Sequence, residues 1–217
     1  CVSNGIMTTT LFTIGYSGRS LDEFIALLEQ YKITALCDVR SMPYSSRNPQ
    51  FNREPLQQDL KSRNIEYVFL GEELGARSKD PSSYVAGKAL YNKIAELPLF
   101  KQGLERIKLG MEKNYVLALM CAEKDPLSCH RSILICRNLR DANIDIRHII
   151  DNKSIETQSD LEQRLVKQLK ISPDLFRDTE PSDPVERAYE IQGDRIAYVE
   201  KDAQKMVEVV REENEHY

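Results

Sequence analysis

The sequence predicts an α/β fold with a mostly parallel central sheet of about five strands, helices on both faces, and a C-terminal helical and hairpin appendage. Short apolar runs rich in β-branched residues alternate with amphipathic helical segments, which is typical of βαβ units. Right-handed crossovers then place helices on both faces of the sheet. At 217 residues, we predict a disordered segment over 1–9, an α/β domain over 10–150, and an appendage over 151–217 that packs on it.

Composition narrows the class of protein. Hydrophobic residues make up 41% and charged residues 29%, an ordinary globular balance. A net charge of −4 disfavours a broad electrostatic surface for nucleic acid, although a local basic cleft is compatible with it. No window has the roughly 18 apolar residues of a membrane helix. The start lacks the features of a signal peptide, and Met7 is a candidate first residue, so five cysteines predict reduced thiols in the cytoplasm.

The first part of the predicted domain contains three strands, at residues 10–14, 33–39 and 65–70. Ser20 with Glu23 three positions later forms a capping box that begins a helix after the first strand. A second helix is predicted over 54–63. Two long polar loops, 41–52 and 71–87, follow the second and third strands, and loops of this length are often functional. The second of them is a candidate lid over a site.

The second part begins with helices over 88–97 and 99–111, separated at Pro98. A strand over 115–120 follows. Asp125 and Pro126 are favoured as N-cap and first helical residue, so they predict a helix running to Ala142. A fifth strand is predicted over 144–150. The appendage is predicted to contain a helix over 160–169, a turn-rich linker over 173–184, a hairpin within 187–199 around the Gly193-Asp194 pair, a helix over 203–213, and a fraying tail over 212–217.

Unusual polar residues follow each of the first four predicted strands. In parallel sheets, ligands bind beyond the carboxyl ends of the strands, so these residues are expected to converge at one edge. They are Gly15, Tyr16 and Ser17 after the first strand, Asp38 and Arg40 at the second, Glu72 and Glu73 after the third, and residues 121–131 after the fourth. The convergence predicts a site at this edge.

Three of these motifs, in this order, resemble the DUF488 family. They are Thr13-Ile14-Gly15-Tyr16-Ser17, then Asp38-Val39-Arg40 with Pro43 and residues 46–51, and finally Cys121-Ala-Glu-Lys-Asp-Pro with Cys129-His130-Arg131. The resemblance covers residues 10–150 and implies a cytoplasmic bacterial or archaeal α/β domain without an established activity. Two positions depart from the family pattern: Tyr16 stands where histidine is usual, and residues 74–77 read Leu-Gly-Ala-Arg where Gly-Gly-Arg is more usual.

The cysteine motif offers candidate catalytic residues, namely Cys121, Glu123, Cys129 and His130. Cys129 lies in the first turn of the predicted helix, beside His130 and Arg131, where a thiol pKa is lowered. Its spacing from Cys136 is equally typical of a buried helix face. We assign no metal, because structural zinc favours cysteine pairs two to four residues apart and no second pair exists. Nor does an arginine follow Cys121 by six residues, as in tyrosine phosphatases and rhodaneses.

An anion site is the alternative to thiol chemistry. Arg40, Arg47 and Arg131 follow different strands and are candidates to bind a phosphate or carboxylate together, unless Asp38 and Glu123 pair with them structurally. The other candidate ligand-binding residues are Gly15, Tyr16, Ser17, Asp38, Ser46 and Phe51.

The sequence therefore predicts a hydrolase or transferase acting on a phosphorylated or nucleotide-like ligand. Two alternatives stay open: a non-catalytic module that binds a nucleotide or nucleic acid, and a Cys/His structural metal site. No cofactor and no oligomeric state can be read from the residues.

Overall fold

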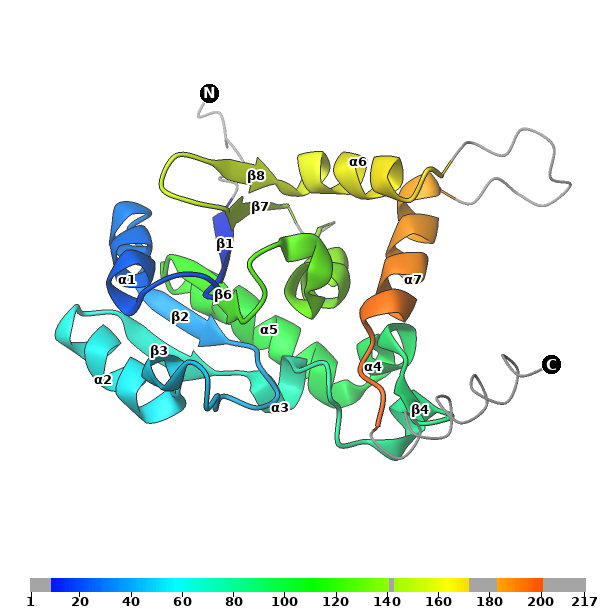
Figure 1. Cartoon of the computed structure of the whole chain (residues 1–217), viewed down its shortest axis with the longest axis horizontal. Helices are drawn as coiled ribbons and strands as arrows, with labels where there is room; N and C mark the ends of the chain where they lie inside the picture. Colours follow the sequence, from blue (N-terminus) through cyan, green and yellow to red (C-terminus); the bar gives the residue numbers. More distant parts are fainter. Residues whose placement is uncertain (1–8, 141–142, 172–182, 201–217) are drawn as a thin grey trace, which may run out of the picture.

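The structure is a computed structural model, and it describes residues 9–140, 143–171 and 183–200. A six-stranded sheet in the order β3-β2-β6-β1-β7-β8 forms its centre (Figure 1). The strands are β1 Thr9–Gly15, β2 Ala35–Asp38, β3 Glu66–Phe69, β6 Leu117–Cys121, β7 Ile144–Ile149 and β8 Ile155–Thr157. The first five are mutually parallel, which confirms the predicted sheet. Only β8 is antiparallel, paired with β7 at the edge. Its three residues are too few to show a strand pattern, so it was not predicted.

Helices cover both faces of this sheet, as predicted. One core packs α1 (Leu21–Gln30) and α2 (Arg53–Ser62) on one face. The other core packs α5 (Pro98–Glu112) and α6 (Gln158–Gln168) on the opposite face. The capping box of α1 forms with both hydrogen bonds, so Ser20 and Glu23 begin this helix as the sequence predicted. Among the described residues, no helix is long and apolar enough to cross a membrane.

The predicted loop over 71–87 is more structured than expected. It holds the short helix α3 (Gly71–Leu74) and strand β4 (Tyr84–Val85), which pairs with β5 (Lys88–Ala89) in a hairpin. Ala86 and Gly87 both have positive φ, the conformation that a two-residue hairpin turn requires. The prediction of helix from residue 88 was therefore wrong at its start, and α4 spans Tyr91–Glu96.

The hairpin predicted within 187–199 was wrong. These residues belong mainly to helix α7 (Pro184–Ile196), with Gly193 inside it. Asp183 caps the helix by accepting a hydrogen bond from Val185 N, and Pro184 occupies the first turn. A Cβ at Gly193 would lie 3.3 Å from the Tyr91 ring, so glycine permits close packing of α7 here and makes no turn.

The predicted helix over 125–142 is interrupted. A 3₁₀ turn, η3 (Pro126–Ser128), comes first, and Cys129 then adopts extended backbone with φ −133° and ψ 138°. Helical structure resumes as a π turn, η4 (Arg131–Ile135), and a further 3₁₀ turn, η5 (Cys136–Asn138). Cys129 is thus not in the first turn of one continuous helix. Its carbonyl accepts hydrogen bonds from Ser132 N and Ile133 N, so it is the residue from which the second helical segment starts.

The remaining predictions fall partly outside the described residues. The predicted disordered start lies there except for residue 9, as do most of the linker 173–184, the helix 203–213 and the tail. After α7, the chain continues to residue 200 along the β4–β5 hairpin, where Val199 pairs with Lys88. The described part of the appendage therefore packs on the α/β domain.

A buried histidine connects the sheet to the appendage. His148 on β7 lies 2.8 Å from Thr13 Oγ1 on β1 and 3.0 Å from Gln158 Oε1 on α6. Burial lowers the pKa of His148 to about 3, so the imidazole is neutral in the fold.

This neutral histidine predicts an acid-dependent loss of stability. The unfolded chain takes up a proton near pH 6.5 and the folded chain only near pH 3, so stability is present above pH 6.5 and falls as pH decreases between these values. The slope from this group is at most about 1.4 kcal/mol per pH unit. Urea unfolding across this range should show a shallower pH dependence for His148→Gln than for the original chain. Equal slopes would contradict the assignment.

Candidate functional site

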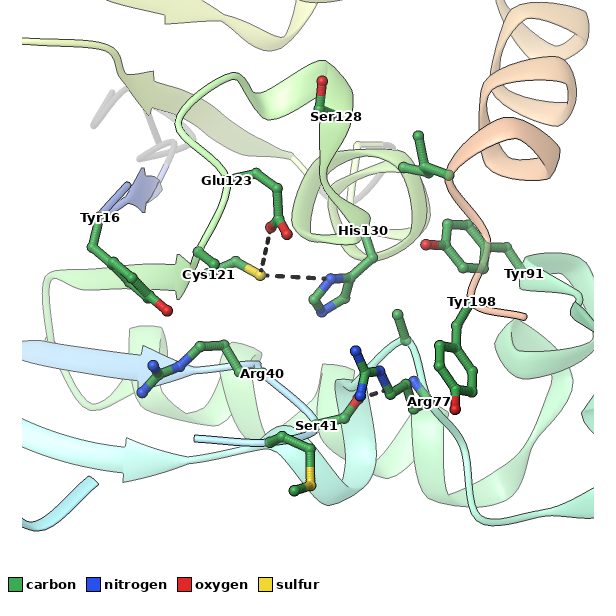
Figure 2. A pocket seen from close by; sticks show the side chains of 14 residues that line it. Tyr16, Arg40, Ser41, Arg77, Tyr91, Cys121, Glu123, Ser128, His130 and Tyr198 are labelled. Carbon is green, nitrogen blue, oxygen red and sulfur yellow. Dashed lines mark hydrogen bonds between the residues drawn. The ribbon is translucent and has the colours of Figure 1, made fainter. Parts of the chain in front are cut away.

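A cavity of about 260 Å³ opens beyond the carboxyl ends of β1, β2 and β6 (Figure 2). Its walls come from the predicted edge of the sheet, from the loop after α3, from α4, and from the chain around the end of α7. The lining residues are Tyr16, Arg40, Ser41, Met42, Ala76, Arg77, Tyr91, Cys121, Ala122, Glu123, Ser128, His130, Ile196 and Tyr198. Of the predicted site residues, this cavity therefore brings together Tyr16, Arg40, Cys121, Glu123 and His130.

Thiol, carboxyl and imidazole groups form a cluster in this wall. Cys121 Sγ lies 3.1 Å from Glu123 Oε2 and 3.7 Å from His130 Nδ1, the two contacts drawn in Figure 2. Cys129 Sγ lies 3.9 Å from the same Nδ1. The two sulfurs and this nitrogen are all within 4.8 Å of one another. All four predicted catalytic residues thus belong to one cluster.

The orientation of His130 is fixed by the end of β2. Its Nε2 lies 2.9 Å from the carbonyl oxygen of Val39, which can only accept a hydrogen bond. Nε2 therefore carries the proton, and in the neutral ring the lone pair is on Nδ1. That lone pair faces both cysteine sulfurs. The ring is buried, so the arrangement does not depend on solvent.

The two thiols differ in acidity and in access. Burial opposes ionisation of Cys129, but Cys121, Arg131 and His130 together lower its pKa well below the usual value. The hydrogen bond between Cys121 and Cys129, together with burial, raises the pKa of Cys121 well above the usual value. Only Cys121 is among the residues that line the cavity. Burial opposes protonation of His130, but its hydrogen bond with Cys129 and the charge of Cys129 raise the pKa of the imidazole. Ionisation is therefore favoured at Cys129, the thiol farther from the opening, with His130 as its partner.

Glu123 turns back into the cavity although the residue as a whole is exposed. Its carboxyl group contacts Cys121, and Figure 2 shows it above the sulfur. Desolvation and the negative charge of Cys129 raise the pKa of Glu123.

Arg131 holds the loop that carries this cluster. Its Nη1 donates to the Glu123 carbonyl at 2.6 Å, its Nη2 to the Lys124 carbonyl at 3.1 Å, and its Nε to Thr13 Oγ1 at 3.3 Å. The side chain is 1% exposed and does not line the cavity. The described contacts of the Arg131 side chain are therefore with the protein itself, and its predicted role in ligand binding stays a prediction.

The end of β1 packs directly against the same loop. A Cβ on Gly15 would lie 1.8 Å from the Glu123 carbonyl oxygen, so only glycine allows this approach. Tyr16 N donates to the Cys121 carbonyl and Ser17 N to the Ala122 carbonyl, at 3.2 and 2.8 Å. Gly15 and Ser17 thus support the backbone of the loop and do not line the cavity, and their predicted role in ligand binding stays a prediction.

The Tyr16 ring stacks on Phe51, with centroids 4.4 Å apart. Phe51 is fully buried and belongs to the core. Arg40 also contacts the Tyr16 ring, with its guanidinium carbon 5.2 Å from the ring centroid. Its Nε and Nη2 donate hydrogen bonds to the carboxylate of Asp38 at 2.9 and 2.6 Å. Arg40 and Asp38 therefore form the structural ion pair that was considered as the alternative to ligand binding. Its Nη1 is nevertheless buried without a hydrogen-bond partner among the described residues.

Ser46 and Arg47 are exposed on the loop after β2 and do not line the cavity. Sequence reasoning missed Arg77, whose guanidinium carbon is 4.5 Å from the centroid of the Tyr198 ring. In Figure 2, Arg77 lies below His130. The position of Arg77 in the predicted lid was the available signal. Tyr91 and Tyr198 gave none, because the segments that carry them were assigned to a plain helix and to a hairpin.

Fold and site together define an α/β protein with a polar site at the carboxyl edge of a parallel sheet. Residues 20–137 match the model of the family described as "Domain of unknown function DUF488", and the chain belongs to this family. Neither a curated protein nor a solved structure matches the chain.

The role of Arg131 predicts a large loss of stability on its removal. Arg131→Met would leave the carbonyls of Glu123 and Lys124 without their donors, at a cost of about 2–4 kcal/mol. Urea unfolding measures this free energy. Arg63→Met is the control, because Arg63 pairs with Glu29 at the surface and should change stability little. Equal stability of the two variants would show that the hydrogen bonds from Arg131 to this loop do not stabilise the fold.

Proposed function

We propose that this protein is an enzyme, a hydrolase or transferase, that acts on a small ligand carrying a phosphate or similar anionic group. One observation carries the proposal: two arginines, Arg40 and Arg77, line the same cavity as Glu123. Cationic groups at one end and a protonatable group at the other are the parts that acid–base chemistry on an anion requires.

Arg77 is the main candidate to bind the anion. Its side chain is exposed and held against Tyr198, so it reaches the cavity without a carboxylate in its own described contacts. Arg40 is paired with Asp38, and its Nη1 is a buried donor without a hydrogen-bond partner among the described residues, so a phosphate reaches it only if the side chain moves. A phosphate that receives bonds from both would use the planar donor geometry of arginine.

The walls suggest the size and character of the ligand. A cavity of about 260 Å³ is at the small end of the range for ligand sites. Tyr16, Tyr91 and Tyr198 supply aromatic surface, which suits a sugar or another small organic group joined to the phosphate. A compact phosphoester therefore fits the proposal better than a long nucleic-acid segment.

Glu123 is the candidate general acid or base, because its carboxyl group lines the cavity. A simple thiolate nucleophile is less well supported. The thiol with the lowered pKa, Cys129, is not among the lining residues, and the lining thiol, Cys121, has a raised pKa. Accessibility and ionisation are thus divided between the two sulfurs.

The anion site predicts a selective effect of Arg77. Inorganic phosphate should raise the melting temperature of the original chain at constant ionic strength, since a ligand that binds only the folded state stabilises it. Arg77→Ala should lose at least half of that shift in a thermal-shift assay. Arg47→Ala, an exposed arginine that does not line the cavity, is the matched control and should keep the full shift. Equal shifts for all three proteins would refute the site.

Catalysis is tested separately from binding. Phosphomonoesters and nucleotides are screened for turnover by phosphate release, and Glu123→Gln should lower kcat by about 100-fold or more while keeping the phosphate-induced shift. Glu72→Gln, a surface carboxyl paired with Lys79, is the control. Phosphate binding without turnover of any compound would favour a non-catalytic binding module, and full activity of Glu123→Gln would exclude Glu123 as the acid or base.

A further inference from the structure

We infer that Cys121, Cys129 and His130 form a binding site for one thiophilic divalent cation, zinc by the chemistry of the ligands. The inference goes beyond the proposed function, which concerns the anion and the carboxyl group. Two sulfurs and one imidazole nitrogen converge on a single point in the wall of the cavity, with all three atoms within 4.8 Å of one another.

The distances are close to those of a ready-made zinc site. With zinc–sulfur bonds of about 2.3 Å and zinc–nitrogen bonds of about 2.0–2.1 Å in a tetrahedron, sulfur and nitrogen lie about 3.6 Å apart. Here His130 Nδ1 is 3.7 Å from Cys121 Sγ and 3.9 Å from Cys129 Sγ. A cation placed between the three atoms therefore needs only small side-chain movements.

The surroundings of the imidazole favour the same conclusion. A histidine that binds a metal donates its other ring N–H to a carbonyl or carboxylate, which fixes the tautomer and strengthens the ligand. Val39 O plays this part for His130 at 2.9 Å. With Nε2 held by Val39 O, Nδ1 is the ring nitrogen that is directed toward both sulfurs, as a metal ligand requires.

Two thiolates and one neutral imidazole would balance the charge of a divalent cation. Thiolate and imidazole together select zinc over magnesium or calcium, which prefer oxygen. Three protein ligands leave a fourth position open, the arrangement of catalytic zinc sites. Cys121, His130 and Glu123 all line the cavity, so a cation held here would be next to it, and Glu123 would be placed to act as acid or base for a water that the cation activates.

Cobalt titration of the full-length, reduced protein tests the assignment. After treatment with a chelator, the original chain should bind one equivalent of Co²⁺ and develop the sulfur-to-cobalt charge-transfer absorption and the intense visible bands of a tetrahedral thiolate site. Zinc should displace the cobalt and abolish these bands. Cys129→Ser and His130→Ala should bind Co²⁺ at least tenfold more weakly, whereas Cys136→Ala, a buried thiol outside the cluster, should bind it like the original chain.

Circular dichroism of each variant separates loss of the site from loss of the fold. Should Cys129→Ser fail to fold, protection of two thiols from a thiol reagent by zinc in the original chain gives the same test. Absence of charge-transfer absorption, or equal binding by the original chain and a folded Cys129→Ser, would overturn the inference. Arg77→Ala and Glu123→Gln should keep cobalt binding, so failure here and failure of the phosphate or turnover experiments are distinguishable.

Discussion

The candidate site depends on one buried guanidinium group. Arg131 donates to the carbonyls of Glu123 and Lys124 and thereby fixes the backbone of the loop that follows β6. Buried carbonyls need partners, and no regular strand or helix supplies them in this loop. Since Arg131 itself comes after the break at Cys129, the loop and the helical segment that follows it hold each other in place. The position of Glu123 beside Cys121 depends on this contact, whereas Val39 O fixes the ring of His130.

The broken helix then explains how residues eight positions apart in the sequence meet. A continuous helix from Pro126 would have set Cys129 and His130 at fixed angles on its surface, as the sequence analysis assumed. The extended backbone at Cys129 resets that angle, and its sulfur accepts a hydrogen bond from Arg131 N at 3.4 Å. Cys129 consequently faces the end of β6, where Cys121 lies, while Cys136 remains in the core.

Patterns that extend over many residues allowed much of the fold to be predicted. Hydrophobic periodicity and capping identified the five parallel strands and α1 because each involves repeated, local signals. The Gly193-Asp194 pair led to a wrong prediction of a hairpin, because glycine is equally suited to a turn and to close packing of a helix. The close packing of α7 against Tyr91, which explains the glycine, is a contact between distant residues that the sequence does not reveal. The edge of the sheet predicted where Cys121, Glu123 and His130 would meet. It could not predict Arg77 and Tyr198, whose place in the wall depends on how the hairpin and the chain after α7 pack together.

The contrast among the four buried cysteines shows what is particular to the cluster. Mainly through burial, the pKa of Cys37 is raised to about 12 and that of Cys136 is also raised, as expected for thiols that serve as small apolar side chains. Cys129 is equally buried, but the hydrogen bond with Cys121 and the nearby Arg131 and His130 lower its pKa well below the usual value. A charge in the interior is costly unless it is compensated, and Arg131 and His130 supply positive charge beside this one. In the proposed zinc site, the same thiolate would be one of three ligands, together with the sulfur of Cys121 and Nδ1 of His130.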